Sequence, residues 1–392
     1  MRNLKRALSL ALAAIMLIGM MVVSASAAGF DDFSDKDEIV NKDAVSMLVS
    51  LGIIEGKPDG SYGPTENVDR AQMAKMLSVI MNKGVDNSAL YQSVNSGLVD
   101  VNTNWAKGHI NYCYTTGIIA GRGNGKFDPS ATVTALEAAK MLLVAVGYDP
   151  AIEGFEGADW AINVSVRADE QGIFEGFTKD LSAPLNRDDA ALLIYNALDV
   201  EMIQSYTTNN YPIVYSDHRT ILSDKYGVIK VEGVVTANEW AILDDDTDTA
   251  LQEGKTRIYN PDGILSTTGN TAVAQDSSAN VKTQVFNVST PVDMLGKAVT
   301  MYVKKTTILA DSTVYGAPVV SDVNTVIETG EKVTGGDSKD DDSLAALLKG
   351  TGLATDKATE YYHNYEEVAI DSADVDDIMN VKGAALTVID ND

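Results

Sequence analysis

The chain has 392 residues, with 56 aspartates and glutamates against 30 lysines and arginines, and its formal net charge at pH 7 is -26. Nucleic acids and anionic membrane surfaces repel a chain of this charge, so neither is an expected partner. A chain of this length exceeds what one hydrophobic core organises, and two or three domains are expected.

The N-terminus has the pattern of a secretory signal peptide over residues 1–27. Three basic residues precede an apolar run at 7–23, and Ala25-Ser26-Ala27 forms a small-residue cleavage site. A membrane span needs about 20 apolar residues, and no later segment approaches that length. We therefore predict cleavage and export, with no transmembrane span in the cleaved protein.

Three segments of the N-terminal half share one pattern. Each runs from an apolar helix end through a glycine, two apolar residues and a second glycine to a polar turn that closes on proline. From the second glycine to the proline the interval is 8 positions in all three segments, which are 51–64, 116–129 and 171–184. Self-similarity at fixed offsets indicates a repeated supersecondary unit.

Each unit reads as helix, glycine-rich turn, helix. Gly52, Gly117 and Gly172 follow apolar helical patterns and stand where a helix ends in a left-handed residue. The second helices are expected to begin at the N-cap residues Asp69, Thr134 and Asn186, with Thr134 to Glu137 as a capping box. One such helix pair cannot bury its apolar face alone, so three are expected to pack together.

These residues resemble the S-layer homology domain of bacterial surface proteins over about residues 30–200. The matching features are an F-x-D opening, a Trp-Ala pair, the G-I-I-x-G turn and a T-R-A-E-like cap. In this sequence they are Phe33-Ser34-Asp35 and more loosely Leu98-Val99-Asp100, the Trp-Ala pairs at 105–106 and 160–161, and the turns and caps given above.

The resemblance implies a pseudo-threefold helical module that docks onto a secondary cell wall polymer attached to peptidoglycan. In the family, the cap arginine, the tryptophan and the turn glycine line grooves that take an acidic, often pyruvylated sugar. Carried over position by position, the polysaccharide-binding residues are Arg70, Arg187, Trp105, Trp160, Gly56, Gly121 and Gly176.

Elementary chemistry supports the same residues. An arginine at a helix N-terminus stands beside unpaired N–H groups and can hold a carboxylate with two parallel hydrogen bonds. An indole ring can stack on a sugar. The alternatives are that the arginines are solvated helix residues paired with Asp or Glu, and that the tryptophans are core anchors.

All three units depart from the family pattern. The second has Ala135 in place of the arginine, and the first has Val40 in place of the tryptophan. The third places its cap only two residues after Pro184, against five in the others. One or two working grooves are therefore expected, not three.

Beyond residue 200 the pattern changes to short runs rich in β-branched and aromatic residues. Residues 225–330 read as a small antiparallel barrel or sandwich, after a linker at 201–224. Its alternation is clearest at 230–234 and 300–304. The predicted strands of this half are 212–216, 226–238, 256–260, 281–289 and 298–304.

An acidic linker at 331–343 precedes a partial module at 344–392, with a helix at 344–348 and strands at 366–370 and 385–389. The end directly after a strand favours a truncated chain. The predicted fold class is multidomain α+β, in which an all-α module of three helix-turn-helix repeats (30–82, 96–148 and 155–200) precedes the antiparallel β region.

No motif indicates a catalytic or metal centre. His109, His218 and His363 lie far apart, and Cys113 is the only cysteine, so it is expected to be a buried small hydrophobe. The acidic runs at 244–248 and 340–342 lack EF-hand spacing. We therefore expect no cofactor.

Three functions remain open. The leading hypothesis is a non-enzymatic, exported surface protein held to wall polysaccharide by its repeats. The second is a wall-attached enzyme that acts on polysaccharide, with its catalytic domain in or beyond the C-terminal half. The third is a subunit that self-associates in a surface layer.

Overall fold

The computed structural model describes residues 29–243, 250–260, 264, 282–304 and 312–321, and the backbone of four strands between 325 and 390. The predicted signal peptide, both acidic runs, the acidic linker and the helix at 344–348 lie outside the described residues. No helix in the described part of the chain is long and apolar enough to cross a membrane.

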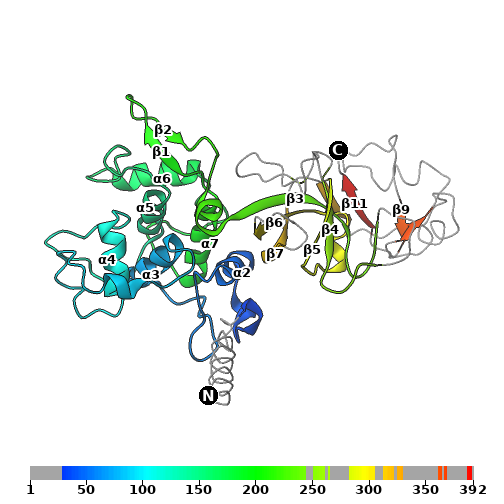
Figure 1. The fold of residues 1–392 in the computed structure, drawn as a ribbon, viewed down its shortest axis with the longest axis horizontal. Helices are drawn as coiled ribbons and strands as arrows, with labels where there is room; N and C mark the ends of the chain where they lie inside the picture. Colours follow the sequence, from blue (N-terminus) through cyan, green and yellow to red (C-terminus); the bar gives the residue numbers. More distant parts are fainter. Residues whose placement is uncertain are drawn as a thin grey trace, which may run out of the picture.

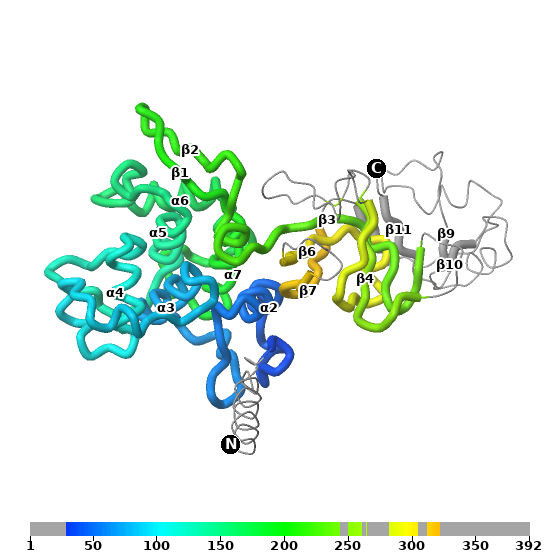
Figure 2. Tube along the Cα trace, viewed as in Figure 1, coloured from blue at the N-terminus to red at the C-terminus, as the bar shows by residue number. Residues whose placement is uncertain are grey.

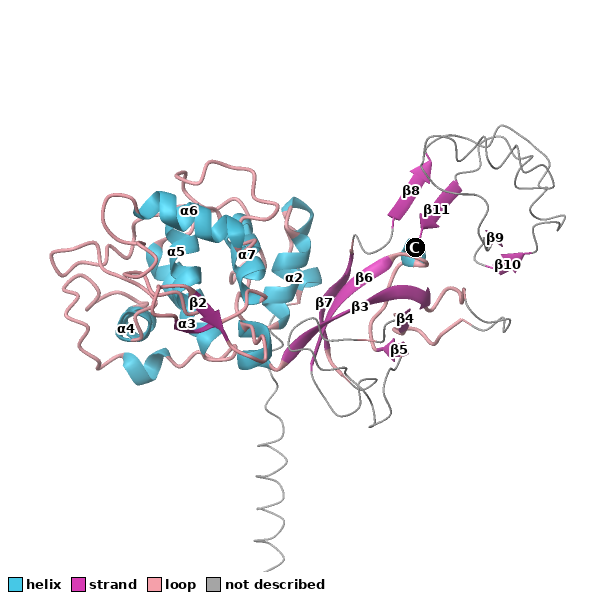
Figure 3. Ribbon diagram, turned by 90° about the horizontal axis from the view of Figure 1, so that it is seen from above, coloured by secondary structure: helices cyan, strands magenta, loops and turns pink. Residues whose placement is uncertain are grey.

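Helices and strands gather at opposite ends of the molecule, apart from one small hairpin beside the helices (Figures 1 and 3). This separation supports the predicted α+β class. The α-helices described in the N-terminal half come in three successive pairs: α2 (Lys42–Ser50) with α3 (Arg70–Met81), α4 (Lys107–Thr115) with α5 (Ala135–Ala145), and α6 (Trp160–Glu170) with α7 (Arg187–Leu198).

The first helix of each pair ends as its glycine predicts. Gly52, Gly117 and Gly172 have φ values of +70°, +80° and +69°. The isoleucine after each glycine donates its N–H to the carbonyl five residues earlier, at 2.8 to 2.9 Å. This closure satisfies an orphan helix carbonyl and turns the isoleucine into the core. Cys113 supplies one of these carbonyls and is fully buried, as predicted.

The second helices begin at the predicted caps. The Asp69 carboxylate accepts from the N–H of Gln72, and the Thr134 hydroxyl accepts from that of Glu137; both form complete capping boxes. Asn186 accepts from the N–H of Asp189 without the reciprocal bond. Each cap satisfies a backbone donor that the helix itself cannot pair.

A closed ring of three backbone hydrogen bonds ties the second helices together. Val68 donates to Leu185 at 2.8 Å, Leu185 donates to Val133 at 2.8 Å, and Val133 donates to Val68 at 2.9 Å. Each of the three residues is buried and stands two positions before the first residue of α3, α5 or α7. The N-termini of these three helices therefore converge on one point.

The C-terminal half contains an open five-stranded antiparallel sheet. Its strand order is β5 (Thr283–Phe286), β4 (Thr256–Tyr259), β3 (Val228–Ala237), β6 (Ala298–Lys304), β7 (Val314–Val320). The prediction was a barrel or sandwich, and a barrel is not confirmed in the described residues, because β5 and β7 are edge strands that do not pair with each other. The β3 to β6 predictions are confirmed within three residues at each end, whereas β7 was not predicted.

Outside this sheet, the described strands form three two-stranded pairs. β1 (Ile203–Tyr206) pairs with β2 (Pro212–Val214) inside the segment assigned to a linker, beside α6 (Figure 2). β8 (Thr325–Thr329) pairs with β11 (Leu386–Asp390), on the other side of the acidic linker. β9 (Tyr361–His363) pairs with β10 (Glu366–Val368).

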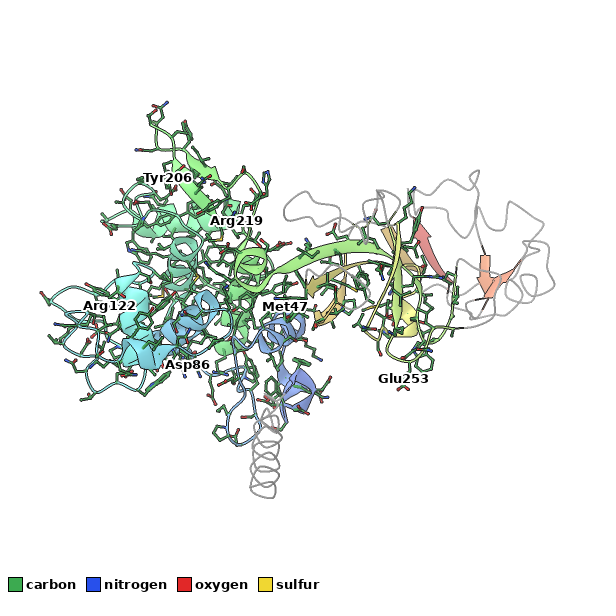
Figure 4. The ribbon with its side chains drawn as sticks, in the orientation of Figure 1. Met47, Asp86, Arg122, Tyr206, Arg219 and Glu253 are labelled. Atoms are coloured by element: carbon green, nitrogen blue, oxygen red, sulfur yellow. The ribbon has the colours of Figure 1, made fainter. Side chains whose placement is uncertain are left out.

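The sheet packs directly against α2 and α7. The Tyr195 hydroxyl of α7 donates to that of Tyr302 of β6 at 3.2 Å, with the rings edge to face. Met47 of α2 lies on the side of the helical part that faces the sheet, and Arg122 lies on the far side (Figure 4). Because helices cover its outer face, Tyr302 is only 7% exposed, and β6 does not show the alternation of burial that its sequence predicts.

Candidate functional site

Arg70 begins α3 and reaches across to the turn between α4 and α5. Its Nε donates to the carbonyl of Phe127 at 2.8 Å, and its Nη2 donates to the carbonyl of Ala120 at 2.9 Å. The guanidinium lies 4.4 Å from the centre of the Phe127 ring, and Arg70 is 4% exposed. The arginine therefore lies directly beside Gly121, a turn glycine of the next helix pair.

Arg187 begins α7 and makes the matching contacts with the turn between α2 and α3. Its Nε donates to the carbonyl of Tyr62 at 2.9 Å, and its Nη2 donates to that of Glu55 at 3.1 Å. The guanidinium lies 4.7 Å from the centre of the Tyr62 ring. This arginine therefore lies beside Gly56, more than 130 positions earlier in the chain.

Both guanidiniums are oriented in the same way. Two of the three nitrogens hold main-chain carbonyls, and Nη1 has no hydrogen bond to any described residue. Neither Arg70 nor Arg187 forms an ion pair with a described carboxylate, so the alternative of solvated, acid-paired arginines does not hold there. A fixed guanidinium with unused N–H donors is suited to bind a carboxylate.

A carboxylate from the F-x-D motif holds each of these two turns. Asp35 accepts from the N–H groups of Tyr62 at 2.7 Å and Gly63 at 2.8 Å. Asp100 accepts likewise from Phe127 and Asp128. Although burial opposes the shift, these hydrogen bonds lower the pKa of both carboxyls. The motif thus supports the turn, and its acid groups do not lie free for a ligand.

Space requires a glycine at two of the three turns, at positions 56 and 121. A Cβ at Gly56 would lie 2.6 Å from Cε1 of Phe33, and one at Gly121 would lie 2.9 Å from the carbonyl oxygen of Lys126. Gly176 has φ +73° and no contact of this kind. Their first role is therefore to shape the backbone that meets the arginines.

Around Gly121 lies a group that we name the second-turn cluster: Arg70, Ala120, Arg122, Lys140 and Trp160. Burial and the neighbouring charge of Arg122 lower the pKa of Arg70 to about 10. Lys140 Nζ lies 5.8 Å from the centre of the Trp160 ring and donates to the Phe155 carbonyl. Burial lowers the pKa of Lys140, and the charge of Arg70 adds to the shift although Glu156 opposes it.

The first-turn cluster is its counterpart around Gly56: Arg187, Glu55, Lys57, Lys75 and Trp105. Lys75 Nζ lies 3.3 Å from Oε2 of Glu55, whose carbonyl holds Arg187. Lys57 is paired with Glu66. Trp105 lies two residues before α4 with 58% of its surface exposed, so it is not a core anchor.

A buried histidine, His109, lies between Trp105 and Lys75 of the first-turn cluster. The Trp105 ring lies edge-on to that of His109, with centres 6.4 Å apart. Burial lowers the pKa of His109, which Asp86 opposes, and the charge of Lys75 lowers it further. His109 Nδ1 also contacts the Ser78 hydroxyl at 2.6 Å. Trp160, in contrast, begins α6 as predicted and is half-buried.

The third turn lacks these groups. Ala135 stands where the arginine would begin α5, and Leu192 stands where the other two clusters have a lysine. A Cβ at Gly176 would lie 3.7 Å from Cδ2 of Leu192. Val40 is 83% exposed at the tryptophan position. The structure thus brings each predicted arginine to a turn glycine, where it meets further cations that were not predicted, and Gly176 belongs to neither cluster.

Sequence reasoning missed the lysines and Arg122. Arg122 and Lys57 directly follow the turn glycines, and Lys75 and Lys140 lie five positions after the first helical residue of α3 and α5. Their shared offset in the first two units was the available signal. Among the described residues, no group of three His, Cys, Asp or Glu side chains could hold a metal ion.

A family model for the S-layer homology domain matches residues 32–74 and 99–139. The chain carries S-layer homology domains. The two matches contain both turns that the arginines reach, and each ends within the second helix of its pair. The S-layer homology resemblance drawn from the turn and cap motifs is therefore confirmed for the first two helix pairs.

The relatives that the chain resembles in sequence include surface proteins and an enzyme. A cell surface protein of Thermoanaerobacter kivui is 28% identical over the whole chain, which covers 44% of that relative. An S-layer protein of Bacillus licheniformis is 33% identical over 29% of the chain and 12% of its own length. An amylopullulanase of Thermoanaerobacterium thermosulfurigenes is 30% identical over 43% of the chain and 9% of its own length.

The chain thus spans less than half the length of these relatives. Together with the S-layer homology domains, the surface-protein relatives indicate a location at the cell wall or cell surface. They also support the anchoring of a surface protein to the wall.

Proposed function

We propose that the helical part anchors the protein to the wall by binding acidic groups of a secondary cell wall polysaccharide at the two clusters. The observation that carries this proposal is that Arg70 and Arg187 are each fixed by two carbonyl bonds with Nη1 left for a ligand. A carboxylate on a sugar can accept those donors, while Trp105 or Trp160 offers a ring for the sugar face.

We also propose that the anchor comprises three repeats, the third at 155–200. The cyclic hydrogen bonds of Val68, Val133 and Leu185 support this, because each helix pair supplies one member of the ring. The third pair contributes Arg187 and Trp160, one to each cluster. Removal of the third pair would therefore disable both clusters, although its own turn binds nothing.

The test is sedimentation of the full chain with walls of the bacterium that encodes it, before and after acid extraction of the non-peptidoglycan polymer. Binding should disappear on extraction and weaken in Arg70→Ala and in Arg187→Ala, by about tenfold or more in the more affected of the two variants. Arg219→Ala is the matched control, since Arg219 pairs with Asp217 and Asp224 outside both clusters.

Because Arg70 is buried, its loss could also disturb the fold, and Trp105→Ala gives an independent reading at an exposed position. Weaker binding in folded Trp105→Ala would support the proposal. Binding that survives polymer extraction, or that is equal in all variants and the control, would contradict it.

A second candidate is polysaccharide-degrading activity, which the similarity to the amylopullulanase suggests, and we place it in the C-terminal half. The amylopullulanase match covers only 9% of that enzyme. The test is release of reducing sugar when the full chain is incubated with wall glycan or plant polysaccharide. Release above that of a heat-treated sample would favour the enzyme.

A further inference from the structure

The two clusters correspond residue for residue. At an offset of 65 positions, Gly56 corresponds to Gly121, Lys57 to Arg122 and Lys75 to Lys140, and at an offset of 55 positions Trp105 corresponds to Trp160. Each cluster therefore has three cations, counting the arginine that arrives from another helix pair. The position before the turn glycine breaks the correspondence: it is Glu55 in the first and Ala120 in the second.

This difference changes the charge that a ligand meets at the first-turn cluster. The Glu55 carboxylate lies 3.3 Å from Lys75, and Glu66 pairs with Lys57. Two of the three cations are thus matched by carboxylates, and only Arg187 is held by neutral carbonyls alone. An anionic ligand would have to compete with Glu55 for Lys75.

At the second-turn cluster the balance is reversed. Arg122 pairs with Glu137 at 2.7 Å. Arg70 and Lys140, however, are bonded to carbonyls of the main chain and form no ion pair with a described residue. Both of these cations are therefore held by neutral main-chain groups.

Like charges contribute to the titration of both side chains. Burial is the main cause of the lowered pKa of Arg70 and of Lys140; the charge of Arg122 adds to the shift at Arg70, and the charge of Arg70 adds to it at Lys140, while nearby carboxylates oppose both shifts. A bound anion would relieve this repulsion in a partly buried setting, where charges interact more strongly than in water.

We propose that the two clusters are unequal, that the second-turn cluster is the primary site for the anionic group, and that residues 55 and 120 set the ranking. This inference rests on the proposed anchoring function. It assigns Lys140 a direct role in holding the ligand and makes Glu55 a residue that weakens the first-turn cluster.

The experiment is a titration of the full chain with the acid-extracted wall polymer at fixed ionic strength, in which the affinities of single variants are compared. Ala120→Glu places a carboxylate beside Lys140 and should lower the affinity about two- to fivefold, the range of an exposed charge pair. Glu55→Ala should raise it by a similar factor. Both positions are exposed, so the fold should be kept.

The arginine variants give the second arm. Arg70→Ala should lower the affinity about tenfold or more, and Arg187→Ala less than about threefold. When the arginine changes are made in the double variant Glu55→Ala/Ala120→Glu, Arg187→Ala should lower the affinity more than Arg70→Ala. Lys140→Gln should lower the affinity, as Arg70→Ala does.

The failures are distinguishable. If Arg70→Ala and Arg187→Ala reduce the affinity equally and Ala120→Glu has no effect, the clusters are equivalent and the inequality is wrong, while the anchoring function stands. If none of the variants changes the affinity, both the inequality and the anchoring function fail.

Discussion

Arg187 donates from Nη2 to the main-chain carbonyl of Glu55 at 3.1 Å, across 132 positions of sequence. The bond joins the last helix of the anchor to its first turn, so the helical part closes on itself. Arg70 makes the equivalent bond to Ala120. The proposed ligand binding and the closure of the helical part therefore depend on the same two side chains.

Arg187→Lys should retain the charge but lose the two-carbonyl geometry, because a lysine ammonium is a point donor and lacks the planar fork. We expect the free energy of unfolding to fall by about 1 to 2 kcal/mol, as the carbonyls of Tyr62 and Glu55 lose their shared partner. Urea denaturation measures this, with Lys83→Arg as a control at the end of α3. Unchanged stability would show that charge alone is sufficient.

Gly56→Ala should destabilise the first unit by about 1 to 3 kcal/mol, since its methyl group would press on the Phe33 ring. The second unit has Leu98 at the Phe33 position. Phe33→Leu combined with Gly56→Ala should therefore cost less than the sum of the two single changes. Thermal unfolding of the unchanged chain, the two single variants and the double variant measures this. If the two losses of stability simply add in the double variant, contact with the Phe33 ring is not the cause.

Asp100→Asn should lower the free energy of unfolding at pH 7 by about 1 to 2 kcal/mol, because the carboxylate accepts two backbone N–H groups. Since its folded-state pKa lies below the ordinary 3.8, this stabilisation is present above that pH and is lost as the pH falls through the folded value. The difference in unfolding free energy between Asp100→Asn and the unchanged chain should therefore be smaller when urea denaturation is measured near pH 3. Asp31→Asn, at an exposed surface pair, should be neutral at both pH values.

Asp199, at the end of α7 beside the sheet, should have the opposite pH dependence. Burial raises its pKa to about 6, which Lys230 opposes and Glu232 supports, and its Oδ1 is buried without a hydrogen bond. A raised folded-state pKa gives stability that is full below 3.8 and is lost as the pH rises through 6.

Asp199→Asn should therefore stabilise the full chain at pH 7.5 by about 1 to 2 kcal/mol and have a smaller effect at pH 5. Chemical denaturation at the two pH values is the measurement. A variant that is less stable at both would show that the charged Asp199 is favourably paired with Lys230, 3.9 Å away.

Much of the helical part could be predicted because its signals are local. Gly52 and its counterparts end helices through bonds that span five residues, and Thr134 and Glu137 satisfy each other within a single turn. The β-strands were less predictable. The π-helical turn at Leu222–Tyr226 and strand β1 carry no strong period, and the buried Tyr302 reads from sequence as a residue on an exposed face.

The sequence by itself determined the repeat, its helix ends and caps, and the arginines and tryptophans that could bind an acidic sugar, because each depends on residues within a few positions. Only the tertiary structure decided which arginine meets which turn. The ring of Val68, Val133 and Leu185 brings each cap to another unit's turn, through contacts over distances that no local pattern records. The lysines beside those turns can be assigned to the clusters only from the folded structure, because electrostatic interaction depends on separation in space.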